Sequence, residues 1–338
     1  MKNLAFQKGA PSIFVLTSPF QTLCALNALH EFEITDYLFY LALDEDIRNQ
    51  QLFRLLDSHG ISYHTVYMNQ IDKKYMLKSC LPHKSKHQRL FIGDIRNRMQ
   101  YYVGLSLLGN RGSIVYLDDG NDNIFLLKGF RQCLTKSLLK NKLLVKTACL
   151  FRLINDNNNI YTVYGDIKNN HYNIRLNDFK RLVNNHQHAV IKDVFFIGTN
   201  YARYCEPGNL SLSMVKKNLE TMLHGLKEKY GNEYEIYYIA HGRDMADFPK
   251  EYCKCYSIHY IRPEITVELF ISQLGYQPYY ILGYTSTALY NIKLLFPKTI
   301  IKNIIFKVEP SNDFIRQIYV VTDYYERHGI PTIEFVEG

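Results

Sequence analysis

The strongest constraint on the fold is a unit that recurs along the chain: a short apolar run ends in small or polar residues, and a helix-length segment follows. In the first half these runs are Ile13–Leu16, Tyr37–Leu43, Tyr63–Met68, Leu90–Ile92 and Ser113–Leu117. They are rich in Val, Ile, Phe and Tyr and show little alternation with polar residues, which is typical of parallel strands buried on both faces. The pattern therefore predicts an α/β chain built on parallel sheets.

The rhythm stops between about residues 155 and 188, where Asn-rich, turn-prone segments occur, and then it restarts. The later runs are Val190–Ile197, Tyr234–Ala240, Tyr256–Ile261, Pro278–Gly283 and Thr299–Phe306, followed by a helical segment, Asn312–Arg327. A chain of 338 residues suits two domains. We expect two Rossmann-like domains, residues 1–175 and 176–338, facing a cleft; the final helix could pack back on the first domain.

The beginning of the chain imitates a secretion signal, because Lys2 and Lys8 precede an uncharged stretch, Gly9–Leu29. Polar residues interrupt that stretch, so a strand, a turn and a helix describe it better. There is no run of 18 apolar residues to span a membrane, and the seven cysteines follow no disulfide pattern. We expect a cytoplasmic protein, either free or at the inner face of the cytoplasmic membrane, and its oligomeric state stays open.

The net charge of +8 favours anionic partners without choosing among them. Part of the excess lies in Phe125–Ile154, which carries seven Lys and Arg residues and no acidic residue, with Leu and Phe at roughly helical spacing. Such a stretch suits peripheral contact with an anionic membrane, or it is simply a solvated helix face. Nucleic acid is not an expected partner, because the other basic residues are scattered and there is no RNA-binding signature.

Candidate chemical groups follow the predicted strands, since ligands of such sheets bind at the carboxyl ends of the strands. Asp118-Asp119-Gly120 follows one strand, and Asn121 comes next. Crowded carboxylates suit a general base, although Asp-Asp-Gly is also a common turn. A metal is the third possibility for the pair, but adjacent carboxylates diverge and chelate less well.

The second half offers groups suited to a phosphate. His241 follows a strand and precedes Gly242 and Arg243, a cation suited to phosphate oxygen. Two further strand ends carry small or hydroxyl residues that could open an anion site at a helix N-terminus. They are Gly198, Thr199 and Asn200, and Thr285, Ser286 and Thr287. Glu268, on a predicted helix, could accept hydrogen bonds from a ribose, or it could be an ordinary surface residue.

A metal site has one weak candidate, formed by Cys253, Cys255 and His259. Three ligands on one short, strand-like segment are poorly spaced for zinc, so we expect no metal.

Taken in chain order, these motifs resemble those of the bacterial sialyltransferases of the two-domain GT-B type. Lipooligosaccharide sialyltransferases (glycosyltransferase family 52) and capsular polysialyltransferases are among them. Those families carry an acidic-acidic-Gly motif, a His-Pro motif, a helix Glu and a Ser/Thr pair. Their counterparts here are Asp118-Asp119-Gly120, His241-Gly242, Glu268 and the Thr285–Thr287 cluster, and Leu16–Gln21 resembles the first strand-turn-helix of the lipooligosaccharide type. Gly242 departs from the family proline.

The resemblance implies an inverting transfer from CMP-sialic acid to a hydroxyl of a bacterial surface glycan, such as lipopolysaccharide, O-antigen or capsule, without a divalent metal or other cofactor. Asp118 would be the base, with Asp119 as the alternate, and His241 would protonate or hydrogen-bond the departing phosphate. Thr285 and Ser286, or Ser286 and Thr287, would bind that phosphate, and Glu268 would bind the ribose.

On the same reading, the acceptor would contact residues of the first half, namely Thr17, Gln21, Asp94, Gly120 and Asn121. Two alternatives stay open: a GT-B enzyme using another donor, such as a hexosyl or Kdo nucleotide, and a non-enzymatic module that binds polyanions or membranes.

Overall fold

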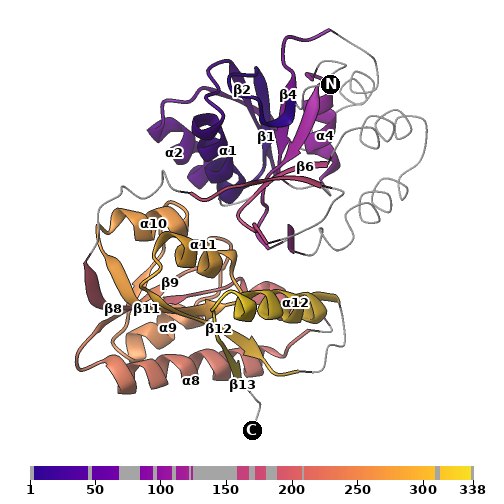
Figure 1. The fold of residues 1–338 in the computed structure, drawn as a ribbon. Helices are drawn as coiled ribbons and strands as arrows, with labels where there is room; N and C mark the ends of the chain where they lie inside the picture. Colours follow the sequence, from indigo (N-terminus) through magenta and orange to yellow (C-terminus); the bar gives the residue numbers. More distant parts are fainter. Residues whose placement is uncertain are drawn as a thin grey trace. The chain divides into compact units, whose positions relative to one another are not determined.

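The computed structural model describes residues 4–44, 48–67, 84–93, 97–108, 112–121, 123–124, 158–166, 172–179, 189–207, 209–308 and 313–335. The chain divides into two compact units, Met1–Phe179 and Lys180–Gly338 (Figure 1). The observed boundary lies four residues beyond the expected one, at residue 179 rather than 175.

The first unit is a seven-stranded sheet of order β3-β2-β1-β4-β5-β6-β7 in which every pair is parallel. Its strands are β1 (Ser12–Leu16), β2 (Tyr37–Leu43), β3 (Tyr63–Tyr67), β4 (Arg89–Ile92), β5 (Ser113–Tyr116), β6 (Asn158–Thr162) and β7 (Tyr172–Leu176). Its helices are η1 (Leu4–Phe6), α1 (Pro19–Glu31), α2 (Asn49–Ser58) and α4 (Arg98–Leu105). Figure 1 shows α1 and α2 on one face of this sheet and α4 on the other.

The central strand of this sheet shows why the sheet is parallel and covered on both sides. All five residues of β1 are buried, and Phe14 stacks between Phe39 of β2 and Phe91 of β4, with ring centroids 4.6 Å apart in each pair. After β1, the Ser18 side chain accepts a hydrogen bond from Gln21 N–H at 3.2 Å and so caps α1, which Pro19 opens. The predicted strand, turn and helix at the beginning of the chain are confirmed.

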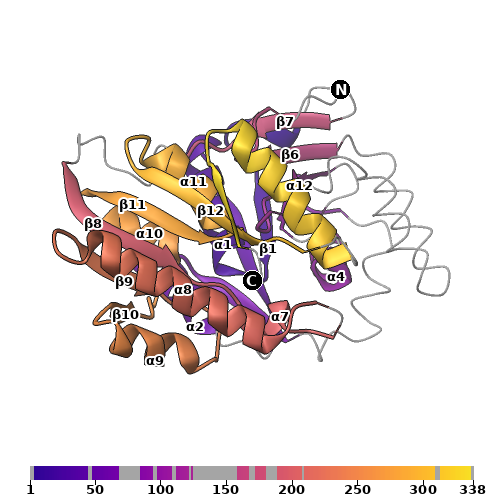
Figure 2. The same ribbon diagram turned by 90° about the horizontal axis from the view of Figure 1, so that it is seen from below.

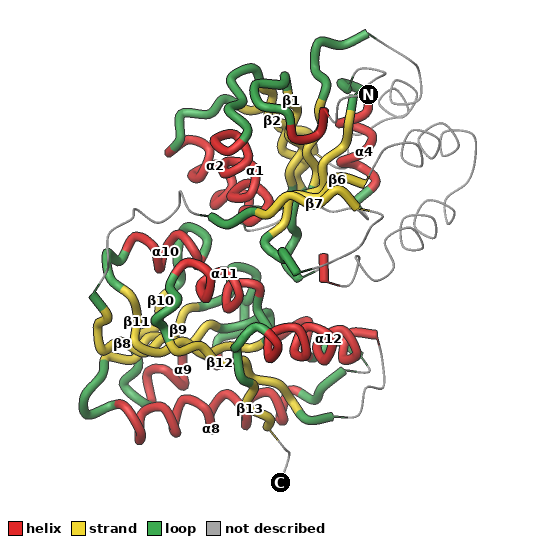
Figure 3. Tube along the Cα trace, in the orientation of Figure 1, coloured by secondary structure: helices red, strands yellow, loops and turns green. Residues whose placement is uncertain are grey.

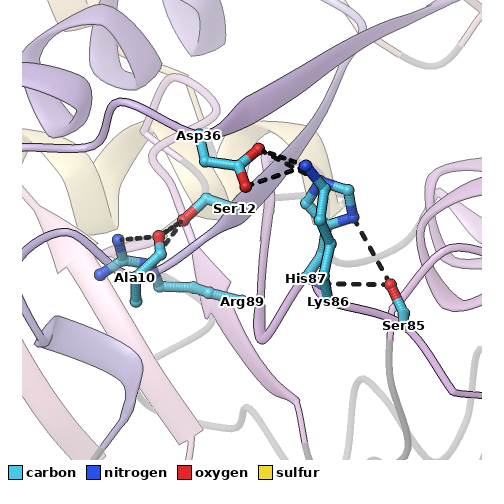
Figure 4. Close-up of polar contacts among 7 residues, drawn as sticks. All are labelled: Ala10, Ser12, Asp36, Ser85, Lys86, His87 and Arg89. Atoms are coloured by element: carbon cyan, nitrogen blue, oxygen red, sulfur yellow. Dashed lines mark hydrogen bonds and ion pairs between the residues drawn. The ribbon is translucent and has the colours of Figure 1, made fainter.

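Opposite the strand ends that carry the candidate site, a buried arginine anchors the N-terminal turn. The Arg89 guanidinium is fully buried and donates to Ser12 Oγ at 2.9 Å and to Ala10 O at 3.1 Å (Figure 4). It also donates to the backbone oxygens of Ala5 and Gln7. Burial lowers the pKa of Arg89 to about 10. Four acceptors compensate for its desolvation, so this cation has a structural role.

The second unit repeats the design with a six-stranded parallel sheet of order β10-β9-β8-β11-β12-β13. Its strands are β8 (Val190–Ile197), β9 (Glu235–Ile239), β10 (His259–Ile261), β11 (Gln277–Tyr284), β12 (Ile300–Phe306) and β13 (Thr332–Phe335). Its helices are α7 (Tyr201–Tyr204), α8 (Leu212–Tyr230), α9 (Phe248–Cys255), α10 (Val267–Gln273), α11 (Thr287–Leu295) and α12 (Asp313–Arg327). Helices α8 and α9 cover one face, and α10, α11 and α12 cover the other (Figures 1 and 2).

In both sheets the strand order reverses beside the first strand, at β1/β4 in one and at β8/β11 in the other. On the two sides of such a switch point the connections leave toward opposite faces of the sheet, which opens a crevice between them. Ligands of doubly wound sheets bind in this crevice, at the carboxyl ends of the strands. Figure 3 shows the alternation of strands and helices that produces this arrangement in each unit.

The sequence pattern missed three strands and placed the bounds of a fourth incorrectly. The polar region 155–188 contains β6 and β7, which complete the first sheet, and β13 follows α12 although Thr299–Phe306 looked like the last strand. The expected strand Tyr256–Ile261 is shortened to β10, because Tyr256 caps the end of α9. Strands at or near a sheet edge carry fewer apolar residues than central strands, so their signal is weaker.

The described contacts of α12 include several within its own unit. Tyr325 Oη donates to Ser286 O at 2.8 Å, and the rings of Tyr324 and Tyr325 pack against Tyr290 of α11. Among the described helices, none combines the length and the apolar character needed to cross a membrane.

Candidate functional site

In the first unit, Asp118 follows β5 and is fully buried. Asn123 Nδ2 and Thr162 Oγ1 both donate to its Oδ1 at 2.6 Å, and Val163 N–H donates to its Oδ2 at 2.8 Å. Burial raises the pKa of Asp118 to about 7, against the lowering effect of these three donors. With both oxygens engaged inside the protein, Asp118 ties the loop after β5 to the end of β6.

Asp119, the next residue, points to different surroundings. It is only half-buried, and Ser18 Oγ donates to its Oδ1 at 3.3 Å. Since Ser18 is the N-cap of the 13-residue helix α1, the carboxylate lies near the positive end of that helix dipole. The structure therefore brings together the ends of β1 and β5, and places Asp119 rather than Asp118 where a substrate could reach a carboxylate.

The rest of this loop is held in place by a tyrosine. Gly120 has φ +67°, a left-handed conformation that favours glycine. The hydroxyl of the buried Tyr164 lies 3.2 Å from Gly120 O and 3.1 Å from Asn121 Oδ1. Gly120 and Asn121 are half-buried.

Of the predicted acceptor contacts at β1, Thr17 is half-buried and Gln21 is fully buried. Gln21 Oε1 accepts from Thr17 N–H and from Gln100 Nε2, each at 2.9 Å. A side chain at Gly93 would collide with Gln21, so the residue that follows β4 is a glycine. The buried Gln21 side chain therefore holds the backbone of Thr17 in place after β1. Asp94 lies outside the described residues.

In the second unit, three adjacent strand ends meet closely because two of them carry glycine. A Cβ on Gly283 would lie 2.7 Å from Ile197 O, and one on Gly198 would collide with the Tyr238 hydroxyl. Thr199 hydrogen-bonds the buried Tyr204, and Asn200 is the N-cap of α7 without a side-chain cap bond. Thr199 and Asn200 are half-buried.

His241 lies in the turn after β9. Arg243 N–H donates to His241 Nδ1 at 3.2 Å, so a neutral ring in this arrangement carries its proton on Nε2. His241 and Gly242 are half-buried and Arg243 is exposed. The imidazole thus carries a single N–H donor, on Nε2.

The end of β11 opens α11. Ser286 caps this nine-residue helix, its Oγ accepting from Ala288 N–H at 3.3 Å, and its hydroxyl proton remains available for donation. Thr285 and Thr287 flank it, and all three residues are half-buried. A capped helix end with hydroxyls suits an anion.

Glu268, on α10, is 5% exposed. Asn291 Nδ2 of α11 donates to its Oε1 at 2.8 Å, and burial raises the pKa of Glu268. The residue joins α10 to α11, so it is more enclosed than a surface glutamate.

Sequence reasoning missed the partners that support these groups. Asn123, Thr162 and Val163 hold Asp118, but Thr162 and Val163 lie in a region that reads as loop. Asp244, three residues after His241, is 1% exposed and had no motif to mark it.

The cysteine candidates for a metal are arranged differently from a metal site. Cys253 and Cys255 lie on α9 rather than on a strand, Cys253 buried and Cys255 exposed, and His259 Nε2 lies 2.9 Å from Glu235 Oε2. Within the described part of the chain, no three His, Cys, Asp or Glu residues are grouped to hold a metal ion. The basic stretch Phe125–Ile154 falls outside the described residues.

Comparison with known proteins finds similar solved structures. An α/β-galactoside α-2,3-sialyltransferase from the luminous marine bacterium Photobacterium phosphoreum matches with TM-score 0.53 and 12% identity over 96% of this chain and 99% of that one. A putative UDP-N-acetylglucosamine 2-epimerase from Listeria monocytogenes matches with TM-score 0.54 and 10% identity, covering 94% and 90%. MnaA of S. aureus, solved with UDP, matches with TM-score 0.53 and 9% identity, covering 94% and 88%.

No protein family and no curated protein sequence matches the chain. At these identities the similarity shows the fold alone. The expected fold class, GT-B with two Rossmann-like domains, is confirmed.

Asp118→Asn should change the pH dependence of stability. A native pKa of about 7 against 3.8 in the unfolded chain means that the native state binds the proton more tightly. The wild-type protein should therefore gain about 2–3 kcal/mol relative to the variant as pH falls from 8 to 5. Urea unfolding at both pH values measures this, with Asp57→Asn, an exposed carboxylate on α2, as a control for the charge lost. A stability difference independent of pH would contradict the assignment.

Proposed function

We propose that the protein is an inverting, metal-independent sialyltransferase. It would move sialic acid from CMP-sialic acid to a hydroxyl of a bacterial surface glycan, such as lipopolysaccharide, O-antigen or capsule. The observation that carries the proposal is the chemistry at the β9 and β11 ends: His241 with an Nε2 proton and the Ser286-capped helix offer neutral donors suited to an anion. The GT-B fold and the motif resemblance support it.

The proposed reaction divides between the units. Asp119 would take the proton from the acceptor hydroxyl, whose oxygen attacks the anomeric carbon as the bond from that carbon to the phosphate oxygen breaks. CMP leaves as a phosphate monoester, and an oxocarbenium-like transition state gains from a base on one side and a stabilised leaving group on the other. No divalent metal is needed in this scheme, because hydrogen-bond donors of the protein would stabilise the negative charge that develops on the leaving phosphate.

The choice of the general base between Asp118 and Asp119 rests on which carboxylate a substrate could reach. The alternate carboxylate, Asp119, is our choice, since Asp118 has both oxygens occupied inside the protein. Asp118 would position the loop instead.

The leaving group would meet the second unit. His241 would donate from Nε2, because protonating Nδ1 as well would break its bond with Arg243 N–H. Ser286, Thr285 and the α11 N-terminus would bind the phosphate, with Thr287 and Arg243 beside them. Glu268, which accepts a hydrogen bond from Asn291, would also accept from the ribose hydroxyls. The donor would be lined by Gly198, Thr199, Asn200 and Gly242.

The glycan acceptor would bind to residues of the first unit. Thr17, Gly120 and Asn121, supported by Gln21, would contact the glycan, together with Asp94. Peripheral attachment to an anionic cytoplasmic membrane through residues 125–154 stays a prediction from charge.

The direct test is a transfer assay in EDTA with CMP-sialic acid and acceptors ending in galactose or in sialic acid. We expect CMP release coupled to product formation, strongly reduced in His241→Ala and retained in His224→Ala, an exposed histidine on α8. Consumption of a UDP-hexose with CMP-sialic acid ignored would overturn the donor assignment and favour another GT-B transferase. Salt-sensitive polyanion binding without turnover of any donor would favour a binding module.

The two aspartates should separate in kinetics. Asp119→Asn should lower kcat by roughly 10²–10⁴-fold with the KM for donor nearly unchanged, because a general base is lost. Asp118→Asn should cost less, on the order of 10-fold, since an amide can still accept from Val163 N–H. The reverse ranking would return the base role to Asp118.

A further inference from the structure

The turn that carries His241 is closed by its fourth residue. Asp244 N–H donates to His241 O at 3.0 Å, and inside the turn Arg243 N–H donates to His241 Nδ1 at 3.2 Å. The tautomer of the imidazole therefore depends on where the Arg243 N–H points. Gly242 adds no stiffness to this turn, because glycine has the widest choice of backbone conformations.

The Asp244 side chain fastens the turn to neighbouring elements. Its Oδ1 accepts from Tyr201 N–H, at the beginning of α7, at 3.4 Å, and the carboxylate takes a second backbone bond from Ala246. Its main-chain oxygen accepts from Arg262 Nη2, just after β10, at 2.7 Å. One residue thus links the turn to the connections that follow β8 and β10.

Burying the Asp244 carboxylate in this position costs desolvation free energy. Asp244 is 1% exposed, its Oδ2 has no hydrogen-bond partner among the described residues, and burial raises its pKa. A buried charge of this kind is weak evidence for stability, since an apolar side chain would avoid the desolvation. What it supplies is geometry, through two backbone N–H groups that an apolar side chain cannot bind.

We propose that Asp244 is the positioning residue of His241: by clamping the turn to α7, it holds the imidazole as the single tautomer with its proton on Nε2. The consequence for phosphate binding rests on the proposed function, but the tautomer does not. Asp244 itself touches no substrate in this account.

The test reads the tautomer directly. In protein labelled with ¹⁵N-histidine, the His241 ring, assigned by its loss in His241→Ala, should show the Nε2–H tautomer at high pH. Asp244→Ala should give a mixture of tautomers, and Asp244→Asn should keep the single form because its oxygen can still accept from Tyr201 N–H. Asp247→Ala, which removes an exposed carboxylate of the same loop, is the matched control and should change nothing. A single Nε2–H tautomer in Asp244→Ala would overturn the proposal.

If Asp244→Ala does not fold, Arg262→Ala takes its place. It removes an exposed side chain and with it the 2.7 Å bond to Asp244 O, and the proposal expects a mixed tautomer here too. An unchanged ring in that variant would count against the clamp.

Kinetics add a double-mutant cycle. Asp244→Ala should lower kcat about 10–100-fold in the wild-type protein but should cost little more in a His241→Ala background, because Asp244 acts through that histidine. Fully multiplicative losses would overturn the positioning role. If no sialyl transfer is found in the wild-type protein, the proposed function fails, and the tautomer measurement still decides on Asp244.

Discussion

The arrangement of the strand ends in the first unit depends on one buried carboxylate. Asp118 receives three hydrogen bonds, two of them from Thr162 and Val163 at the end of β6, so the loop after β5 is held by the next strand of the sheet. That attachment leaves Asp119 facing Ser18 at the N-terminus of α1. Two adjacent, chemically identical residues thus take different tasks, because one is enclosed and saturated with donors while the other remains accessible.

In the second unit, the candidate site is built mainly from neutral groups. Glycines at 198 and 283 let the strand ends approach each other, the turn after β9 presents an imidazole, and Ser286 caps α11 at the end of β11. Each of these features lies at the carboxyl ends of strands near the β8/β11 switch point. The donors there are a ring N–H, hydroxyls and a helix end, with Arg243 as an exposed cation, which suits the single phosphate of a nucleoside monophosphate.

The sequence was informative where apolar runs are long and central. The strands around β1 and β8, the helices α1, α10 and α12, and the strand-end position of the aspartates and of His241 all followed from it. It failed at β6 and β7, whose Asn and polar content imitates a loop, and at β13, which follows the last helix. The choice between Asp118 and Asp119 was inaccessible, since it depends on Thr162 and Val163, more than 40 residues away. Asp244 was missed because its partners lie on other elements.

The central claim is that the second unit holds a nucleoside monophosphate without a metal ion, and calorimetric titration with CMP in EDTA tests it most directly. We expect saturable binding of CMP to the full chain, weakened about tenfold in Ser286→Ala as one hydroxyl contact is lost, and weaker binding of UDP. Binding of UDP in preference to CMP, or binding of either only after Mg²⁺ is added, would contradict it.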